Sequence, residues 1–266
     1  MKKIRNLLYT VVTFVLILLC VYLLEMCVRP TELDTAVDAV KAFHELPENS
    51  VQILCFGSSH MWYGFDPAVI TKEHGISAYN FGCYYQKINT SLLFMQEAFK
   101  TQKPSFVVVD TFYANRLKTD SRFDGELYST KNIRFSADKL SYLKQCFGND
   151  LKSYMDYFFP FAVFHGNWKS FSLSVPDPAK DFDLRKTSGY AAFVPSSFPR
   201  QPVSEQLPLS LEATAILEQM VSLCREHDAR LIFITIPYEE EYKYSAAMNE
   251  FAAKNGCVYM DLFAHI

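Results

Sequence analysis

The chain has 266 residues, of which 50% are hydrophobic and 21% charged, and its formal net charge is −3. This composition excludes an intrinsically disordered protein, because the apolar content is high and the net charge is low. Seven cysteines in a chain of this length exclude a small disulfide-rich scaffold. Only one stretch is apolar over a length that spans a bilayer, which excludes a protein with several membrane spans.

The N-terminal segment predicts a membrane anchor. Basic residues at positions 2, 3 and 5 precede an uncharged run from Leu7 to Leu24. Extended to Val28, this segment forms roughly 33 Å of helix, which matches a hydrocarbon core of about 30 Å. We interpret residues 1–30 as a cytoplasmic tip and a single transmembrane helix, so that the domain after it lies outside the cytoplasm at the cell membrane. A cleaved signal peptide is the alternative, although no small-x-small cleavage site follows.

The part after residue 30 is acidic and has no metal-binding pattern. It retains 22 basic and 28 acidic residues, a net charge of −6. Binding to nucleic acid requires clustered lysine and arginine, so we expect no nucleic-acid partner. No CxxC or HExxH spacing is present, and the sequence predicts neither a metal site nor a cofactor.

Strands and helices alternate after a polar segment at 31–50, which we interpret as a stem. A domain at 51–266 follows, in which an aromatic-rich insertion at about 113–207 interrupts the alternation. This order predicts an α/β fold, a three-layer α/β/α sandwich with a five-stranded parallel sheet. The predicted strands are 51–56, 77–81, 105–110, 230–236 and 257–260, and the predicted helices are 66–74, 87–100, 209–227 and 239–254.

Ligands of an open parallel sheet bind beyond the carboxyl ends of its strands. Four segments occupy such positions, at 57–60, 80–83, 110–111 and from 261 onward. At the first of them, Gly57 lets the backbone turn sharply, so that Ser58 or Ser59 can present an oxygen near a helix N-terminus. The alternative is that the two serines only cap the helix that follows.

Two short motifs resemble a known hydrolase family. The run ILCFGSSH at 53–60, followed by NFG at 80–82, resembles the first two blocks of the SGNH (GDSL-type) hydrolase superfamily, in its membrane-anchored bacterial cell-surface branch. The segment FPFAVFHGNW at 159–168 is similar to the FP…YHxxW insertion of that branch. TIPY at 235–238 is similar to the end of its penultimate strand. The resemblance extends over about residues 51–261 and implies an SGNH or flavodoxin-like sheet.

The resemblance implies acyl chemistry with Ser59 as the nucleophile. The backbone N–H groups of Ser59 and Gly82 would hold the oxyanion, together with a side-chain amide from a third block. That block departs from the family's GxND pattern, because the chain reads DTFYAN at 110–115, so Asp110 and Asn115 are equally weak candidates. A turn residue and a loop asparagine are their structural alternatives.

Two further residues, His60 and Asn80, are expected to line the site. A packed structural histidine is the alternative for His60, which is adjacent to Ser59 and cannot readily fold back as its base.

The catalytic base is the largest departure from the family. The family places an Asp-x-x-His after the fifth strand, followed by a closing helix. In this chain Asp261 and His265 are four residues apart, and the sequence stops at Ile266. We therefore expect the domain to be C-terminally incomplete. The alternatives are that Asp261 ends a strand and that His265 is a solvated residue near a frayed terminus.

The resemblance and the anchor together imply a function at the cell envelope. The leading hypothesis is a membrane-anchored, extracytoplasmic SGNH-like esterase or acyltransferase accessory protein. It would act on acyl or acetyl groups of a cell-envelope polysaccharide or teichoic-acid-like polymer, with a membrane-bound O-acyltransferase as a partner. One alternative is a catalytically inactive relative that binds a glycan or an acyltransferase. Another is a flavodoxin-like phosphate or nucleotide binder that uses residues 57–59 as an anion cradle.

Overall fold

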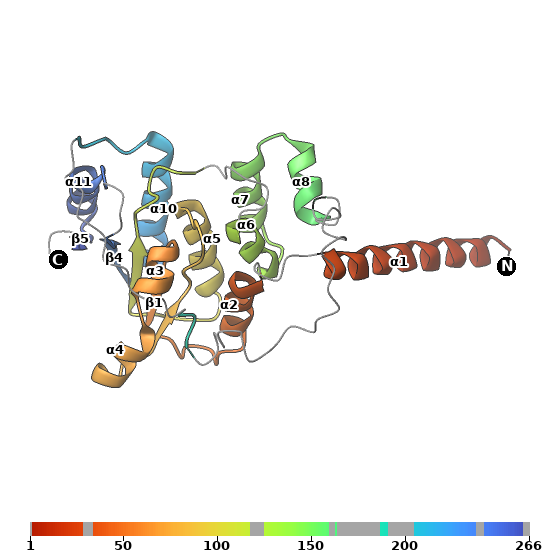
Figure 1. The fold of residues 1–266 in the computed structure, drawn as a ribbon, viewed down its shortest axis with the longest axis horizontal. Helices are drawn as coiled ribbons and strands as arrows, with labels where there is room; N and C mark the ends of the chain where they lie inside the picture. Colours follow the sequence, from red (N-terminus) through yellow and green to blue (C-terminus); the bar gives the residue numbers. More distant parts are fainter. Residues whose placement is uncertain are drawn as a thin grey trace.

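The computed structural model describes residues 2–28, 34–117, 125–159, 163, 187–190, 205–237 and 242–262. The five predicted strands and the four predicted helices are present (Figure 1). Their ends differ by at most two residues, except that the last helix begins at Ser245 and not at 239, with residues 239–241 outside the described ones. The helices are α1 (Lys2–Val28), α2 (Asp34–His44), α3 (Ser59–Gly64), α4 (Pro67–His74), α5 (Ile88–Ala98), α6 (Gly125–Ser129), η2 (Thr130–Asn132), α7 (Ala137–Phe147), α8 (Leu151–Phe158), α10 (Leu211–Glu226) and α11 (Ser245–Asn255). The strands are β1 (Ile53–Phe56), β2 (Ala78–Asn80), β3 (Phe106–Asp110), β4 (Arg230–Thr235) and β5 (Val258–Asp261).

The strands form one parallel sheet in the order β2-β1-β3-β4-β5. Cys55 of β1 is in register with Val108 of β3, and Val108 is in register with Ile232 of β4. The prediction of an α/β fold with a five-stranded parallel sheet is therefore confirmed. Because all strands run the same way, their carboxyl ends meet at one edge, where the candidate residues of β1, β2 and β3 come together.

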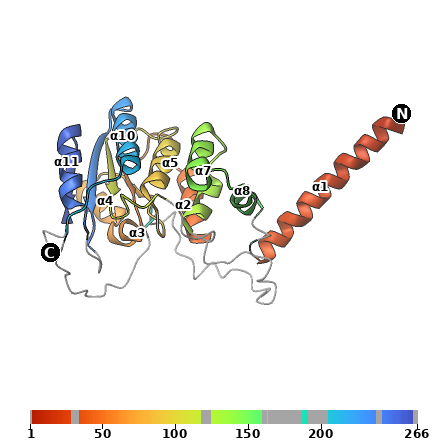
Figure 2. The same cartoon turned by 90° about the horizontal axis from the view of Figure 1, so that it is seen from above.

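One face of the sheet holds the main hydrophobic core. Leu54 and Phe56 of β1, Val107 of β3 and Phe233 of β4 pack there against buried side chains of α5, α10 and α11. The three helices lie beside one another over this face (Figure 2). This cluster has many more buried residues than the one on the opposite face, and burial of apolar area is the dominant stabilising contribution to a fold of this kind.

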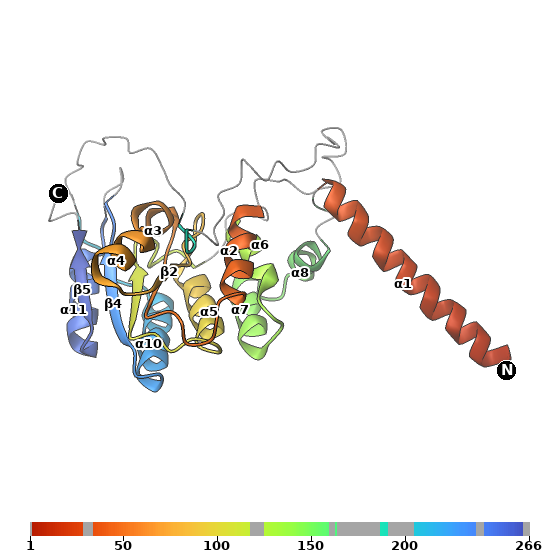
Figure 3. The same ribbon diagram turned by 90° about the horizontal axis from the view of Figure 1, so that it is seen from below.

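The opposite face of the sheet is covered unevenly in the described part of the chain. Met61 of α3 packs on Cys55, Val108 and Ile234 in a second, smaller cluster. In contrast, the β5 side chains on this face are exposed, Val258 by 53% and Met260 by 42%. The second helical layer of the predicted sandwich is thus present at α3 and α4 and incomplete over β5 (Figure 3).

Residues 34–44, predicted as part of a polar stem, form helix α2 and belong to the folded domain. The side chain of Phe43 is 1% exposed, and its ring lies 4.4 Å from that of Phe81. The Tyr79 hydroxyl donates a hydrogen bond of 2.6 Å to the Ala39 carbonyl. Only a short apolar stripe faces the core, so the polar composition of this segment concealed its burial.

Helix α1 extends away from the domain (Figure 1), and its stretch Lys2–Leu24 is long and apolar enough to cross a membrane. A signal sequence meets the same criterion, so both interpretations of the N-terminal segment stay open.

The described part of the predicted insertion is mainly helical. Helices α6, α7 and α8 follow β3, with α6 against α2 and α7 against α5 (Figure 3). Farther along, the short stretch 187–190 lies along β2, where the Asn80 backbone N–H donates to the Ser188 carbonyl at 2.8 Å. The Trp62 indole N–H donates to the Gly189 carbonyl at 2.9 Å. The insertion is therefore joined to both β2 and α3.

Candidate functional site

The two serines after β1 have different surroundings. Ser58 is the N-cap of α3, and its hydroxyl accepts a hydrogen bond of 3.3 Å from the His60 backbone N–H. Its side chain is 1% exposed. The capping interpretation is therefore confirmed for Ser58. Ser59 is the first residue of α3 and is only half-buried, so of the two serines it is the one at the surface of this edge.

Asp110 ties the ends of three strands together. Its carboxylate accepts hydrogen bonds from the Ser58 hydroxyl at 3.2 Å and from the Phe112 and Ile236 backbone N–H groups at 3.3 and 3.5 Å. Burial raises the pKa of Asp110 to about 6, although these hydrogen bonds favour the ionised form. A Cβ on Gly57 would lie 2.6 Å from the Asp110 Cβ, so the approach of β1 to β3 requires glycine there.

His60 is a packed side chain at this edge. Its ring meets the Phe112 ring edge-on at a centroid distance of 4.2 Å. Its Nδ1 lies 4.0 Å from an Asp110 carboxylate oxygen. Burial lowers the pKa of His60 to about 4, so the imidazole is neutral at pH 7. These contacts agree with the structural alternative for this residue.

Asn80 and Gly82 form a fixed turn at the end of β2. The Asn80 amide donates to the carbonyls of Met61 and Phe65, both at 2.8 Å, while its oxygen accepts from the Gly82 backbone N–H at 2.8 Å. A Cβ on Gly82 would lie 2.5 Å from the Trp62 backbone nitrogen, so this close approach also requires glycine. The Gly82 N–H, expected to hold an oxyanion, thus donates to Asn80 in this arrangement.

Two further predicted site residues are held by structural hydrogen bonds, Asn115 at the pocket beside the end of β3 and Asp261 at the end of β5. Asn115 joins the loop after β3 to α10, because its amide donates to the Pro208 carbonyl at 3.0 Å and its oxygen accepts from the Ser210 N–H at 2.9 Å. Asp261 ends β5 and accepts a 2.6 Å hydrogen bond from Ser245. Because β5 is three strand positions from β1, Asp261 is about 15 Å from that strand. His265 lies outside the described residues.

The loop at 82–87 follows the end of β2, and its sequence alone assigns it no role beyond Gly82. Tyr84 and Tyr85 are exposed, whereas the residues after them, Gln86 and Lys87, are buried. The Lys87 ammonium lies 2.6 Å from a carboxylate oxygen of Glu126, which itself is fully buried. Only the structure, in which Lys87 of this loop meets Glu126 of α6, shows that the two exposed tyrosines precede a buried ion pair.

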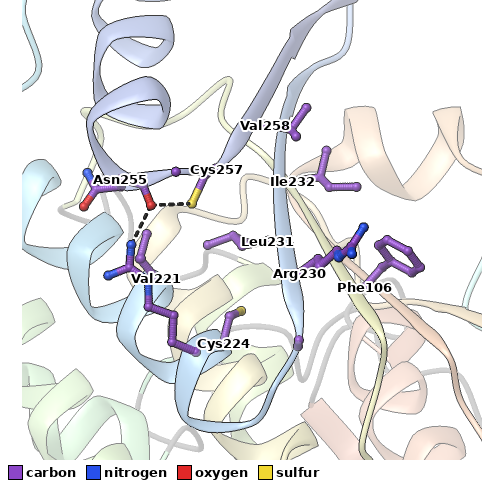
Figure 4. Close-up of a pocket in the computed structure, with 12 residues that line it drawn as sticks. Phe106, Val221, Cys224, Arg230, Leu231, Ile232, Asn255, Cys257 and Val258 are labelled. Carbon is purple, nitrogen blue, oxygen red and sulfur yellow. Dashed lines mark hydrogen bonds between the residues drawn. The ribbon is translucent and has the colours of Figure 1, made fainter.

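Two pockets lie at opposite edges of the sheet. A pocket of about 190 Å³ lies beside the end of β3 and includes Tyr113 and Tyr242. A larger pocket, of about 520 Å³, lies at the opposite edge of the sheet, where Phe106, Arg230 and Val258 begin their strands (Figure 4). The smaller pocket adjoins the candidate site, because Phe112 lines it and packs on His60.

Within the described ranges, no cluster of three or more histidine, cysteine, aspartate or glutamate side chains could hold a metal ion. Comparison with known proteins finds no matching family model and no matching curated protein.

Proposed function

We propose that the chain is a membrane-anchored, extracytoplasmic SGNH-like esterase or acyltransferase accessory protein that acts on acyl or acetyl groups of a cell-envelope polymer. One observation supports this most: Ser59 is half-buried at the surface of the carboxyl edge of the sheet, directly after β1. Around it lie residues from the ends of two other strands, Asn80 of β2 and Asp110 of β3. This is the edge at which ligands of parallel sheets bind.

In the proposed reaction, the Ser59 oxygen attacks the acyl carbonyl carbon, and its proton passes to a base. The tetrahedral intermediate collapses, and the bond to the leaving alkoxide breaks as that oxygen takes the proton from the base. The acyl group stays on Ser59 until the oxygen of water or of a polymer hydroxyl attacks the acyl carbon, gives its proton to the base, and breaks the ester bond to Ser59, whose oxygen takes the proton back. His60 is neutral but buried against Phe112, so it does not fill the role of base. In the family this base is the histidine of an Asp-x-x-His pair. Asp261 and His265 are four residues apart and depart from that spacing, so no base for Ser59 is assigned among the described residues.

A catalytically inactive relative that binds a glycan or a membrane acyltransferase is the second candidate. Two observations favour it. The Gly82 N–H already donates to Asn80, which removes one expected oxyanion donor. Asp261 is held by Ser245, about three strand spacings from β1. Both features are compatible with a protein that retains the fold and the edge of the sheet but has no working catalytic groups.

Labelling with a fluorophosphonate probe tests the enzymatic proposal. An activated Ser59 in the full-length protein should react stoichiometrically, whereas Ser59→Ala should not react. Ser153→Ala is the matched control, because Ser153 is also a half-buried helical serine but lies on α8, away from this edge. It should label like the wild type. Absence of labelling in the wild type, or labelling that persists in Ser59→Ala, would overturn the esterase assignment and favour the inactive relative.

A further inference from the structure

Helix α8 presents large apolar side chains to solvent. Four of them, which we name the α8 stripe, are between 42% and 73% exposed, namely Leu151, Met155, Phe158 and Phe159. The first three are four and three residues apart, so their side chains lie on one side of the helix, and Phe159 follows at its end. Apolar side chains grouped at a surface in this way mark a contact with another molecule or with a membrane.

A different side of α8 holds the helix to the domain. Tyr157 is buried there, and its ring lies 5.9 Å from that of Phe147, the last residue of α7. The hydroxyls of Tyr157 and Thr130 share a hydrogen bond of 2.9 Å. A helix at the surface of a soluble domain ordinarily buries its apolar side and exposes its polar side. Packing of α8 on the domain therefore does not explain the exposed stripe.

The position of α8 in the chain and in the fold brings the stripe near the candidate membrane span. Thr130, which bonds α8, belongs to η2, and η2 contacts α2. Residues 29–33, which join α1 to α2, span at most about 18 Å. Helices α2 and α8 lie at the end of the domain that faces α1, and α11 lies at the opposite end (Figures 1 and 2). A membrane crossed by α1 is therefore within reach of this end of the domain.

A lipid surface fits the stripe better than a second copy of the chain does. The four side chains expose on the order of 500 Å², whereas each partner in a stable dimer buries roughly 800 Å². A lipid surface requires no complementary shape, because the apolar side of an interfacial helix enters the boundary between headgroups and acyl chains. Lys152 follows the first residue of the stripe, and its side chain is mostly exposed. Its ammonium can extend to lipid phosphates from that position.

We propose that the α8 stripe is a membrane-contact surface, which rests on the lipids beside the α1 anchor. A domain joined to its anchor by residues 29–33 alone can rotate against the membrane, and a second contact at α8 restricts that rotation. The carboxyl edge of the sheet, with Ser59, thereby keeps a defined orientation toward the lipid surface. This inference rests on the anchoring part of the proposed function and is independent of the chemistry of Ser59.

Photocrosslinking of the full-length protein in vesicles of phosphatidylethanolamine and phosphatidylglycerol tests the contact. Met155 is replaced by p-benzoylphenylalanine, whose ketone joins to nearby C–H groups on irradiation. Val69 of α4 is the matched control position, because it is exposed to nearly the same extent, 48% against 50%, and lies away from this end of the domain (Figure 1). Mass spectrometry should find phospholipid adducts at position 155 at least about fivefold more often than at position 69.

A third position separates this inference from the anchoring proposal. The same amino acid in place of Leu16, in the middle of α1, should give phospholipid adducts whenever α1 is in the bilayer. Adducts at position 16 with none at 155 would retain the anchor and reject the α8 contact. Absence of adducts at position 16 would reject the anchor and this inference together. Cross-links from position 155 to a second copy, or to another segment of the same chain, in place of lipid would also reject the α8 contact.

Thermal unfolding of the full-length protein in detergent shows whether the stripe belongs to the folded core. Met155→Ser should leave the unfolding temperature within about 2 °C of the wild type, whereas Tyr157→Ser, on the buried side of α8, should lower it well beyond that. An equal loss in the two variants would mean that the stripe packs within the protein, which overturns the inference. Fluorophosphonate labelling of Ser59 should be the same in Met155→Ser as in the wild type, so the enzymatic proposal fails or survives separately.

Discussion

At the residue level, the contacts of adjacent side chains separate structural from functional candidates. Ser58 and Ser59 share one chemistry, but Ser58 is committed to capping α3 and to Asp110, while Ser59 stays at the surface. Asp110 was a weak oxyanion candidate in the sequence, and in the structure its buried carboxylate joins β1, β3 and β4. Its ionisation state should therefore influence stability.

Replacing Asp110 by asparagine should change how stability depends on pH. Because burial raises the pKa of Asp110 to about 6, above its ordinary value near 4, the folded state binds the proton more tightly than the unfolded state. Its contribution is fully present below about pH 4 and is lost as the pH rises through 6. Relative to Asp110→Asn, the wild type should lose about 3 kcal/mol of unfolding free energy between pH 4 and pH 7.

Urea unfolding of both proteins across this pH range measures that difference. Other titrating groups cancel to first order, since they are common to the two proteins. A wild-type curve that runs parallel to the Asp110→Asn curve would mean that this carboxylate ionises as freely in the folded chain as in the unfolded one.

At the level of elements, the insertion supports the site through one buried ion pair. Glu126 of α6 accepts from the Lys87 backbone N–H at the start of α5 and also lies against the Lys87 ammonium. Lys87 is the N-cap of α5, and its side chain makes no capping hydrogen bond. The Glu126 carboxylate instead satisfies a backbone N–H at the start of this helix. Helix α6, the loop at 82–87 and α5 are consequently joined at one buried point.

Glu126→Gln should destabilise the protein by about 3–5 kcal/mol, because the Lys87 charge would remain buried without its counter-ion. Adding Lys87→Met to this variant should restore part of the loss. Asp156→Asn is the control, since Asp156 pairs with the exposed Lys152 at 3.2 Å on one helix face and should cost less than about 0.5 kcal/mol. Equal effects of the two single substitutions in urea unfolding would contradict the importance assigned to the buried pair.

The pattern of elements was largely predictable, whereas the covering of the sheet was not. Apolar runs such as ILCF at 53–56 and FVVVD at 106–110 identify buried parallel strands without further information. Helix α2 was mistaken for stem, because only residues such as Val40 and Phe43 mark its buried side. The contact of α6 with α2 and α5 joins residues far apart in the sequence, and a single sequence contains no signal for it.

At the level of the whole molecule, α1 and α2 should behave differently on truncation. Removal of residues 2–33 should leave unfolding of the domain unchanged, because the side chains of Lys2–Leu24 bury nothing against it. Removal of residues 2–46 should cost at least about 3 kcal/mol, since it also deletes Phe43 from the core. Thermal unfolding of both truncated proteins measures the difference in stability. Equal stability would show that residues 34–44 do not stabilise the domain and belong to a stem.

The sequence by itself determined the order of strands and helices, the parallel sheet they imply, and an apolar N-terminal helix. These follow from local periodicity, segment length and turn residues, which each short window contains. Only the tertiary structure decided which serine caps α3, where the Gly82 N–H donates, and that Asp110 joins the ends of three strands. Those features depend on contacts such as Ser58 with Asp110, 52 positions apart in the chain, which form only when strand ends are brought to one edge.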